Sequence, residues 1–226
     1  MCGIVGYIGS DPALDFLIDG LKKLEYRGYD SSGIVVFNEK PYLKKCQGKI
    51  LKLEKTLKEK ELKLAQVGLG HTRWATHGVP NTVNSHPHVS NSGELYIVHN
   101  GIIENYDSIK EELTKRGHSF ESDTDTEVLT HLIEEVQQQE GVSLFEAVRL
   151  SLAEVIGAYA IAVIEEDNPN EIIIATISSV PAPVIDSIII VDPLCFQQSS
   201  GEISIYANGA GTPFSYDIGN SINTQK

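Results

Sequence analysis

The spacing of apolar and polar positions divides the chain into strands and helices. Residues 2–8, Cys-Gly-Ile-Val-Gly-Tyr-Ile, form a short apolar run that is typical of a buried strand. Residues 11–24 open with Asp-Pro, a helix start, and then carry leucine and isoleucine at intervals of three and four. This pattern predicts an amphipathic helix packed on a sheet. Two further strands are predicted at 34–37 and 41–46.

The middle of the chain alternates charged and β-prone stretches. Residues 49–64 are rich in lysine with interleaved glutamate. That mixture favours a solvated surface helix over one that binds membranes or calmodulin-like partners. Two β-prone runs, 67–71 and 95–98, enclose a polar loop from 73 to 93. Loops of this length in a compact domain are usually functional or disordered.

Helices are clustered in the next part of the chain. Periodic apolar positions predict helices at 106–116 and 126–139, and Ser143 is expected to cap a third. Strands at 158–164 and 171–175 then form a predicted hairpin. Because the order is strands, helices and strands again, the pattern indicates an α+β layered fold and not a doubly wound parallel sheet.

Composition narrows the kind of protein. The 226 residues are 41% hydrophobic and 22% charged, which fits one globular domain with at most a small appendage. The net charge of −13 argues against nucleic acid or an anionic membrane as a partner. The three cysteines have no paired spacing, and no apolar run approaches the roughly 20 residues that span a bilayer. With no signal peptide recognisable, we expect a cytoplasmic protein.

Cys2 is the first candidate for chemistry. Removal of Met1 would leave a thiol and a free α-amine on one residue. A thiolate is the reactive form of cysteine, and an α-amine that titrates at about 7.7–8 can accept the thiol proton at neutral pH. The alternative is that Cys2 is a small hydrophobic residue at the start of a buried strand.

Polar residues in the loops supply partners for such a thiol. Attack on an amide needs hydrogen-bond donors for the developing oxyanion, and Asn100-Gly101 offers a side-chain amide beside a backbone N–H. An amino-acid substrate needs a guanidinium for its carboxylate and a carboxylate for its ammonium group. Arg73 and Asp125 are candidates. Taken singly, Asn-Gly is a common turn and Arg73 a common surface residue.

Taken in order, the motifs resemble a known family. The segments 1–6, 24–33, 71–78, 98–105 and 122–128 closely resemble those of class II glutamine amidotransferases, which are N-terminal-nucleophile hydrolases. Within that class they are similar to the glutaminase domain of the glutamine–fructose-6-phosphate aminotransferases (isomerizing; glucosamine-6-phosphate synthases). The resemblance implies a four-layer αββα sandwich, in agreement with the order of elements.

The resemblance also implies a reaction. L-Glutamine would be hydrolysed to glutamate and ammonia through a γ-glutamyl thioester on Cys2, with the α-amine of Cys2 as the base. Asn100 and the N–H of Gly101 would form the oxyanion hole. Arg73 would bind the α-carboxylate of glutamine and Asp125 its α-amine.

Further residues receive roles from the same resemblance. Thr76 and His77 would assist in binding glutamine, and Arg27 and Gly28 would hold the Cys2 terminus in place. Trp74 matches the residue that gates the site. No metal or cofactor is implied.

The segment His86-Pro87-His88 carries two histidines without a nearby cysteine or carboxylate ligand set. Such spacing makes a poor metal site, and we expect these residues to brace the loop.

The resemblance covers residues 1–176, which we take as the glutaminase domain. The family's two sugar-isomerase domains, which bind fructose 6-phosphate, are absent from this sequence. We therefore expect a fragment or one partner of a split enzyme, with a homo-oligomer left open.

Residues 177–226 form a divergent β-rich segment that resembles part of a β-sandwich repeat of secreted bacterial adhesins. Alternation at 200–207 and 213–218 predicts a hairpin, and we expect a foreign C-terminus rather than a lineage-specific replacement of the last strands. The alternative functions are another class II amidotransferase, against which the segment 73–78 argues, or an inactive chimeric fragment.

Overall fold

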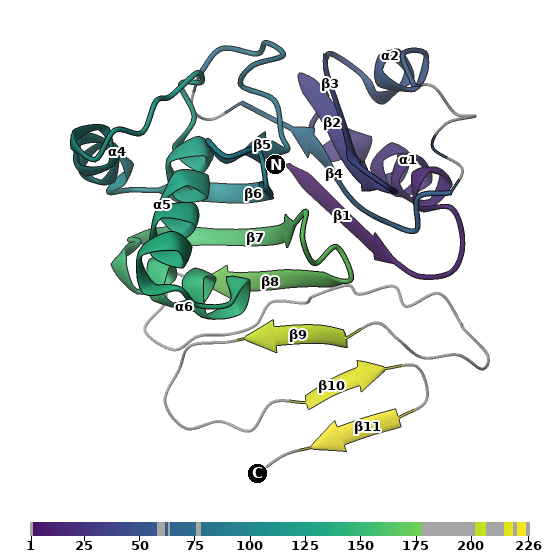
Figure 1. Ribbon diagram of the computed structural model, residues 1–226. Coiled ribbons are helices and arrows are strands. Elements are labelled where there is room, and N and C mark those ends of the chain that lie inside the picture. The colour runs from purple at the N-terminus through teal and green to yellow at the C-terminus, as the bar shows by residue number, and fades with distance from the viewer. Residues whose placement is uncertain are drawn as a thin grey trace.

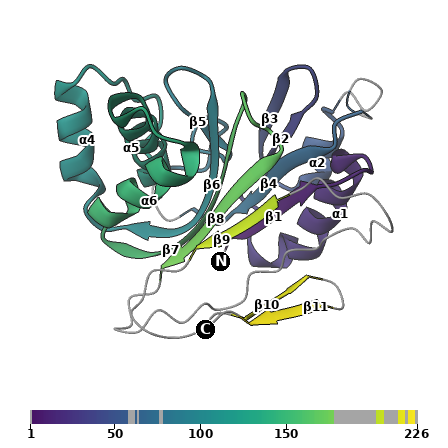
Figure 2. The ribbon, with the colours of Figure 1, turned by 60° about the horizontal axis from the view of Figure 1, so that its bottom comes forward.

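Two β-sheets pack face to face, and helices cover the outer side of each sheet (Figures 1 and 2). The predicted α+β fold of four layers, αββα, is confirmed. The computed structural model describes residues 2–57, 62, 64–75 and 78–177, and the backbone of 202–206, 215–218 and 221–224.

The first sheet is antiparallel and lies beside two helices. Its strand order is β1 (Gly3–Ile8), β4 (Val67–Arg73), β2 (Ser31–Phe37) and β3 (Pro41–Gln47). The covering elements are α1 (Ala13–Leu24), the 3-10 turn η1 (Glu25–Arg27) and α2 (Ile50–Glu54). The strands and the helix predicted for this half are present, but α1 begins at Ala13 without a side-chain cap and β2 begins at Ser31, three residues before its predicted start. The surface helix is much shorter than predicted.

The second sheet is covered by three helices, α4 (Tyr106–Lys115), α5 (Asp125–Glu140) and α6 (Leu144–Glu154). Its strand order is β5 (His88–Val89), β6 (Leu95–Ile103), β7 (Gly157–Glu165), β8 (Glu171–Ile177) and β9 (Glu202–Tyr206). Strands β7 and β8 form the predicted antiparallel hairpin, while β9 runs parallel to β8.

Alternating side chains on β6 belong to two different apolar clusters. On β6, Leu95 and Ile97 pack toward the helices, whereas Tyr96 and Val98 join the apolar layer between the sheets. This follows from the two-residue period of a strand, which sends successive side chains to opposite faces. The inter-sheet layer therefore depends on the register of both sheets.

Helix caps fix where the second helical layer begins. The Thr124 hydroxyl accepts the N–H of Glu127 at 3.4 Å, and that of Ser143 accepts the N–H of Glu146 at 3.3 Å. Side-chain acceptors at these positions satisfy N–H groups that have no partner within the helix. The predicted Ser143 cap is confirmed, and α5 begins at Asp125, one residue before its predicted start.

The lysine-rich stretch does not form one continuous helix from 49 to 64. Helix α2 ends at Glu54, because Ile50 and Leu53 are its only buried residues and a short helix depends on such packing. Residues 58–61 and 63 lie outside the described residues.

The predicted C-terminal hairpin is wrong. Strand β9 pairs with β8, and the hairpin instead joins β10 (Ser215–Ile218) to β11 (Ser221–Thr224). The dipeptide Gly-Asn between β10 and β11 is a two-residue hairpin signal, and the edge of β8 offers unpaired backbone groups to another strand.

Within the described residues, no helix combines the length and the apolar character needed to cross a membrane.

Leu69 tests the inter-sheet layer, where its side chain is fully buried. Replacing Leu69 with alanine is expected to lower the free energy of unfolding by about 2–5 kcal/mol, because a cavity is left between two rigid sheets. Leu51→Ala is the matched control, since Leu51 is 58% exposed on α2, and should change stability by less than about 0.5 kcal/mol. Urea denaturation measures the free energy of unfolding of both variants. Equal decreases would contradict the burial of Leu69 between the sheets.

Candidate active site

The layer between the sheets turns polar at one end. On β4, Leu69 is followed on the same face by His71 and Arg73, and on β6, Val98 is followed by Asn100. All three polar side chains therefore continue the line of residues that pack the two sheets together. His71 Nε2 lies 2.8 Å from Asn100 Oδ1, so the two strands meet there through a hydrogen bond.

Strand register brings the start of the chain to this polar end. Gly3 of β1 pairs with Thr72 of β4, which sets Cys2 beside the end of β4. The Trp74 N–H donates to Cys2 Sγ at 3.2 Å, and the thiol lies 3.5 Å from the Trp74 carbonyl oxygen. The backbone just after Arg73 thus holds the Cys2 side chain.

The sequence predicts a strand that ends at residue 98, before Asn100 and Gly101. In the structure β6 continues to Ile103, so both residues lie within the strand. Asn100 Nδ2 donates to the Cys2 carbonyl oxygen at 3.4 Å. Gly101 has φ +134°, and a Cβ there would lie 2.3 Å from the Ala158 carbonyl oxygen. Only glycine fits this close approach of β7.

A cavity of about 410 Å³ opens beside Cys2. It brings together seven of the expected site residues: Cys2, Arg27, Arg73, Trp74, Asn100, Gly101 and Asp125. Thr76 and His77 lie outside the described residues. The sequence reasoning missed five other lining residues: His86, His99, Ile102, Thr124 and Thr126.

Asp125 is held at the first turn of α5. Its Oδ2 accepts the Ile103 N–H at 2.9 Å, which ties the helix to the end of β6. Its Oδ1 lies 3.4 Å from the Thr126 hydroxyl. A carboxylate at a helix N-terminus interacts favourably with the helix dipole, which suits Asp125 to this position.

Gly28 does not line the cavity but shapes it. A Cβ at Gly28 would lie 2.9 Å from both the carbonyl carbon and the oxygen of Arg73, so no side chain fits against that peptide. The missed residue Asp30 acts on the same segment. Its carboxylate accepts the Ala75 N–H, and its own N–H donates to the Arg73 carbonyl at 3.2 Å. Together they fix the backbone that carries Arg73 and Trp74.

Burial controls the charges in the site. It raises the pKa of the Cys2 thiol, a shift opposed by the hydrogen bond from Trp74 N–H and by the charge of Arg73. It lowers the pKa of His71 to about 3 and that of His86 well below its ordinary value. The histidines are therefore neutral at neutral pH, and Arg73, whose guanidinium stays protonated, supplies positive charge.

His86 and His88, the latter in β5, make contacts that hold this segment in place, as expected. The His86 ring stacks on His71 with centroids 4.1 Å apart, and His88 Nε2 lies 3.0 Å from the Thr124 hydroxyl. The alternation of β4 could have indicated His71, since it shares a face with Leu69. The contact with His86 depends on the path of the loop, which no local pattern specifies.

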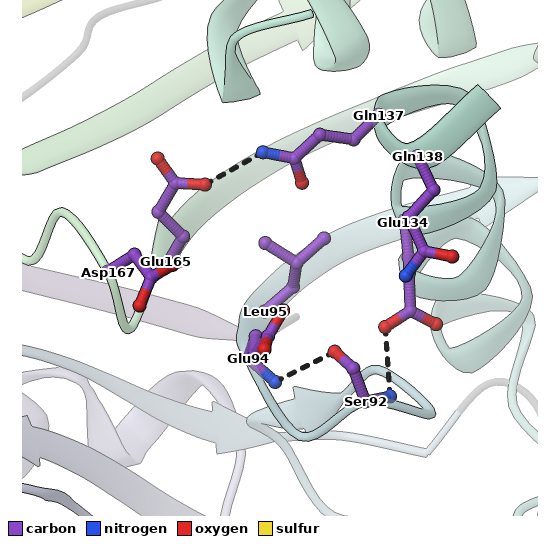
Figure 3. A pocket seen from close by; sticks show the side chains of 8 residues that line it. All are labelled: Ser92, Glu94, Leu95, Glu134, Gln137, Gln138, Glu165 and Asp167. Atoms are coloured by element: carbon purple, nitrogen blue, oxygen red, sulfur yellow. Dashed lines mark hydrogen bonds between the residues drawn. The ribbon is translucent and has the colours of Figure 1, made fainter. Parts of the chain in front are cut away.

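A second, smaller pocket of about 130 Å³ lies beside α5 and contains several carboxylates (Figure 3). Glu134 there accepts the N–H groups of Asn91 and Ser92 at 3.1 and 2.9 Å. His118, His131 and Glu134 place possible metal-ligand atoms within 4.8 Å of one another. Because the carboxylate of Glu134 already binds two backbone N–H groups, we assign it a structural role in holding this turn.

The site suits attack of a thiol on an amide carbonyl, and the comparisons agree with that chemistry. Residues 56–175 match the family described as the glutamine amidotransferase domain, and the chain belongs to this family. The glutamine phosphoribosylpyrophosphate amidotransferase of B. subtilis has a similar fold, with a TM-score of 0.63 and 29% identity over 74% of this chain and 35% of that one.

The chain is also similar in sequence to part of a larger enzyme. The glutamine–fructose-6-phosphate aminotransferase (isomerizing) of Bacteroides thetaiotaomicron is 52% identical over 181 residues, which cover 79% of this chain and 29% of the relative. That of Pyrococcus horikoshii is 53% identical over 176 residues, covering 77% and 29%. The chain thus matches less than a third of the length of these relatives.

Glu127 organises the entry to α5 and hence the position of Asp125. Its carboxylate accepts the N–H groups of Glu121 and Ser122 at 2.9 and 2.7 Å. Burial alone would raise its pKa, but the His131 ring, 3.6 Å away, and hydrogen bonds from Ser122 and the two backbone groups outweigh burial and lower the pKa to about 2.

Replacing Glu127 with glutamine is expected to cost about 1–3 kcal/mol of stability at neutral pH. Since the pKa of Glu127 is lower in the folded state, the stability that its charge contributes is present above about pH 4.5 and is lost as pH falls toward about 2. Urea denaturation over this range should therefore show the gap between wild type and variant closing. A difference in stability that does not change with pH would contradict the assignment of the shifted pKa to Glu127. Glu111→Gln is the control, because Glu111 is exposed on α4 and its replacement should change stability little.

Proposed function

We propose that the chain hydrolyses L-glutamine to glutamate and ammonia, with Cys2 as the nucleophile. The observation that carries this proposal is the meeting of the Cys2 thiol, the Asn100 amide, Arg73 and Asp125 around one cavity. This set supplies a nucleophile, an oxyanion donor and two charges of opposite sign for an amino-acid substrate. Membership in the glutamine amidotransferase domain family supports the choice of substrate.

The first step needs a base, because burial raises the pKa of the Cys2 thiol and leaves little thiolate at neutral pH. After removal of Met1, the α-amine of Cys2 takes the thiol proton. The sulfur bonds to the side-chain amide carbon of glutamine, and the carbonyl π electrons move to oxygen. Asn100 Nδ2 and the Gly101 N–H stabilise that oxyanion.

The intermediate then collapses and releases ammonia. The carbon–nitrogen bond breaks as the Cys2 ammonium returns its proton to the leaving nitrogen, which leaves a γ-glutamyl thioester. Water attacks the thioester carbon, and its proton passes to the α-amine. The carbon–sulfur bond breaks, the thiol is reprotonated, and glutamate leaves.

Two side chains of opposite charge in the cavity lining would orient the substrate. Arg73 binds the α-carboxylate of glutamine and Asp125 its ammonium group, with Thr76 and His77 assisting. Arg73 is anchored by donation from Nη2 to the Gly78 carbonyl at 3.3 Å.

Three expected residues act around the rim in this proposal. Trp74 gates the site. Its ring is half-exposed and contacts the Tyr29 ring edge to face, with centroids 5.7 Å apart. The Trp74 ring therefore remains accessible at the opening of the cavity. Arg27 and Gly28 hold the Cys2 end of the chain, Gly28 through the peptide after Arg73.

We further propose that the ammonia serves the amination of fructose 6-phosphate, the reaction for which the relatives are named. Residues 1–176 act as the glutaminase domain in this view, with 177–226 as an appended segment. The sugar-binding half would come from sugar-isomerase domains not included in this sequence, and the cytoplasm supplies the reducing setting for a free Cys2.

A second candidate is another class II amidotransferase activity. The structural similarity to the phosphoribosylpyrophosphate amidotransferase favours it at the level of fold. Sequence identity of 52% to an aminotransferase, against 29% to that enzyme, supports the first proposal instead.

Labelling of Cys2 tests the nucleophile. Intact mass should show loss of Met1 and one adduct after treatment with a glutamine analogue whose side chain ends in a diazoketone. Cys2→Ala should take no label and release no glutamate, while Cys46→Ser should behave as wild type because Cys46 is buried in β3. A retained Met1 with no adduct would exclude Cys2 as the nucleophile.

Arg73 tests recognition of glutamine. Arg73→Ala should raise KM for glutamine by about 10–100-fold with a smaller effect on kcat, since a hydrogen bond to a charged group contributes about 1.5–3 kcal/mol. Arg73→Lys should recover part of the loss. Arg149→Ala is the control, because Arg149 lies on α6 and pairs with Glu146 on the surface. Steady-state release of glutamate measures both constants, and an unchanged KM removes Arg73 from the site.

A further inference from the structure

His71 has no part in the proposed reaction, yet it touches the oxyanion-hole amide. Its side chain is buried on β4, and Nε2 lies 2.8 Å from Asn100 Oδ1 and 3.0 Å from the carbonyl oxygen of His99. Both neighbours are acceptors, so Nε2 must carry the proton. The Nδ1 atom finds no hydrogen-bond partner among the described residues, which fits a bare nitrogen.

This hydrogen bond decides which way the Asn100 amide points. The two ends of a carboxamide have nearly the same shape but opposite hydrogen-bonding character. With Oδ1 bound to His71, Nδ2 faces Cys2, where it donates to the backbone carbonyl at 3.4 Å. The flipped amide would present Oδ1 to the developing oxyanion and repel it.

The His71 ring is itself locked in place by a second histidine. It stacks on His86 with an interplanar angle of 23°. His86 Nδ1 accepts the N–H of His99 at 3.3 Å, so the proton of His86 is on its Nε2. Both rings are therefore positioned by the backbone of β6, the strand that carries Asn100.

The surroundings of His71 keep it uncharged. Burial is the main cause of its pKa of about 3, and the nearby His99 and Arg73 lower the pKa further, against hydrogen bonds to Asn100 and the His99 carbonyl that raise it. A second proton, on Nδ1, would place a positive charge on a buried ring that stacks on His86. His71 is therefore a fixed donor across the working pH range and not a general base.

We propose that His71 is a positioning residue that orients the Asn100 amide for stabilising the oxyanion. This inference rests on the proposed glutaminase function and assigns His71 no contact with substrate. Its effect should appear in the chemical step and not in the binding of glutamine.

The test compares two substitutions at one position. His71→Phe keeps a ring to stack on His86 but removes the donor, and His71→Gln restores an N–H donor. Removing a single oxyanion-hole donor costs about 10²–10³ in kcat, so misorienting it in His71→Phe should lower kcat by about 10–100-fold with KM within about threefold. His71→Gln should recover most of the loss, and the pH profile should keep its shape.

Two further measurements separate positioning from general damage. Alkylation of Cys2 by iodoacetamide forms no oxyanion, so its rate in His71→Phe should stay within about threefold of wild type. In an Asn100→Ala background, His71→Phe should have little further effect on kcat, because residues that act as a unit are not additive. Should His71→Phe fail to fold, His71→Met makes the same comparison.

The outcomes are distinct. A wild-type kcat in His71→Phe, or an equal loss in the Asn100→Ala background, overturns the inference about His71 alone. A wild-type chain that releases no glutamate overturns the proposed function instead. In that event the Asn100 side-chain amide resonances in a ¹⁵N spectrum still decide the positioning role, since they should shift in His71→Phe and return toward wild type in His71→Gln.

Discussion

The packing of the two sheets against each other is the constraint on which the site depends. The inter-sheet layer is apolar through Leu69 and Val98, and it becomes polar where the same faces present His71 and Asn100. A shift of either strand by one residue would send these side chains to the opposite faces. The register that closes the core is therefore the same register that sets the Asn100 amide beside Cys2.

Neutrality of the buried polar groups follows from this location. His71 and His86 are desolvated and stay uncharged, so the ionisable side chains other than histidine and Cys2 that line the cavity are those of Arg27, Arg73 and Asp125. The same desolvation raises the pKa of the Cys2 thiol. A partly buried thiol with a raised pKa requires a proton acceptor next to it, and the α-amine on the same residue meets that need in the proposed reaction.

Much of the fold could be predicted from local pattern. The helix at 13–24, the Ser143 cap and the hairpin of β7 and β8 follow from periodicity and capping chemistry. Residue chemistry suggested the nucleophile, the oxyanion donors and the two charged residues, and a family resemblance added the others. Seven of these expected site residues line the cavity. The steric role of Gly28 and the stack of His86 on His71 could not be predicted, because each depends on segments far apart in sequence. Pairing of β9 with β8 is non-local in the same way.

The most direct test of the account is a crystal structure of the chain after reaction with the glutamine diazoketone analogue. The account predicts a covalent bond to Cys2, the adduct's carbonyl oxygen within hydrogen-bonding distance of Asn100 Nδ2 and the Gly101 N–H, and its α-carboxylate on Arg73. An adduct on another residue, or a carbonyl oxygen turned away from Asn100, would contradict it.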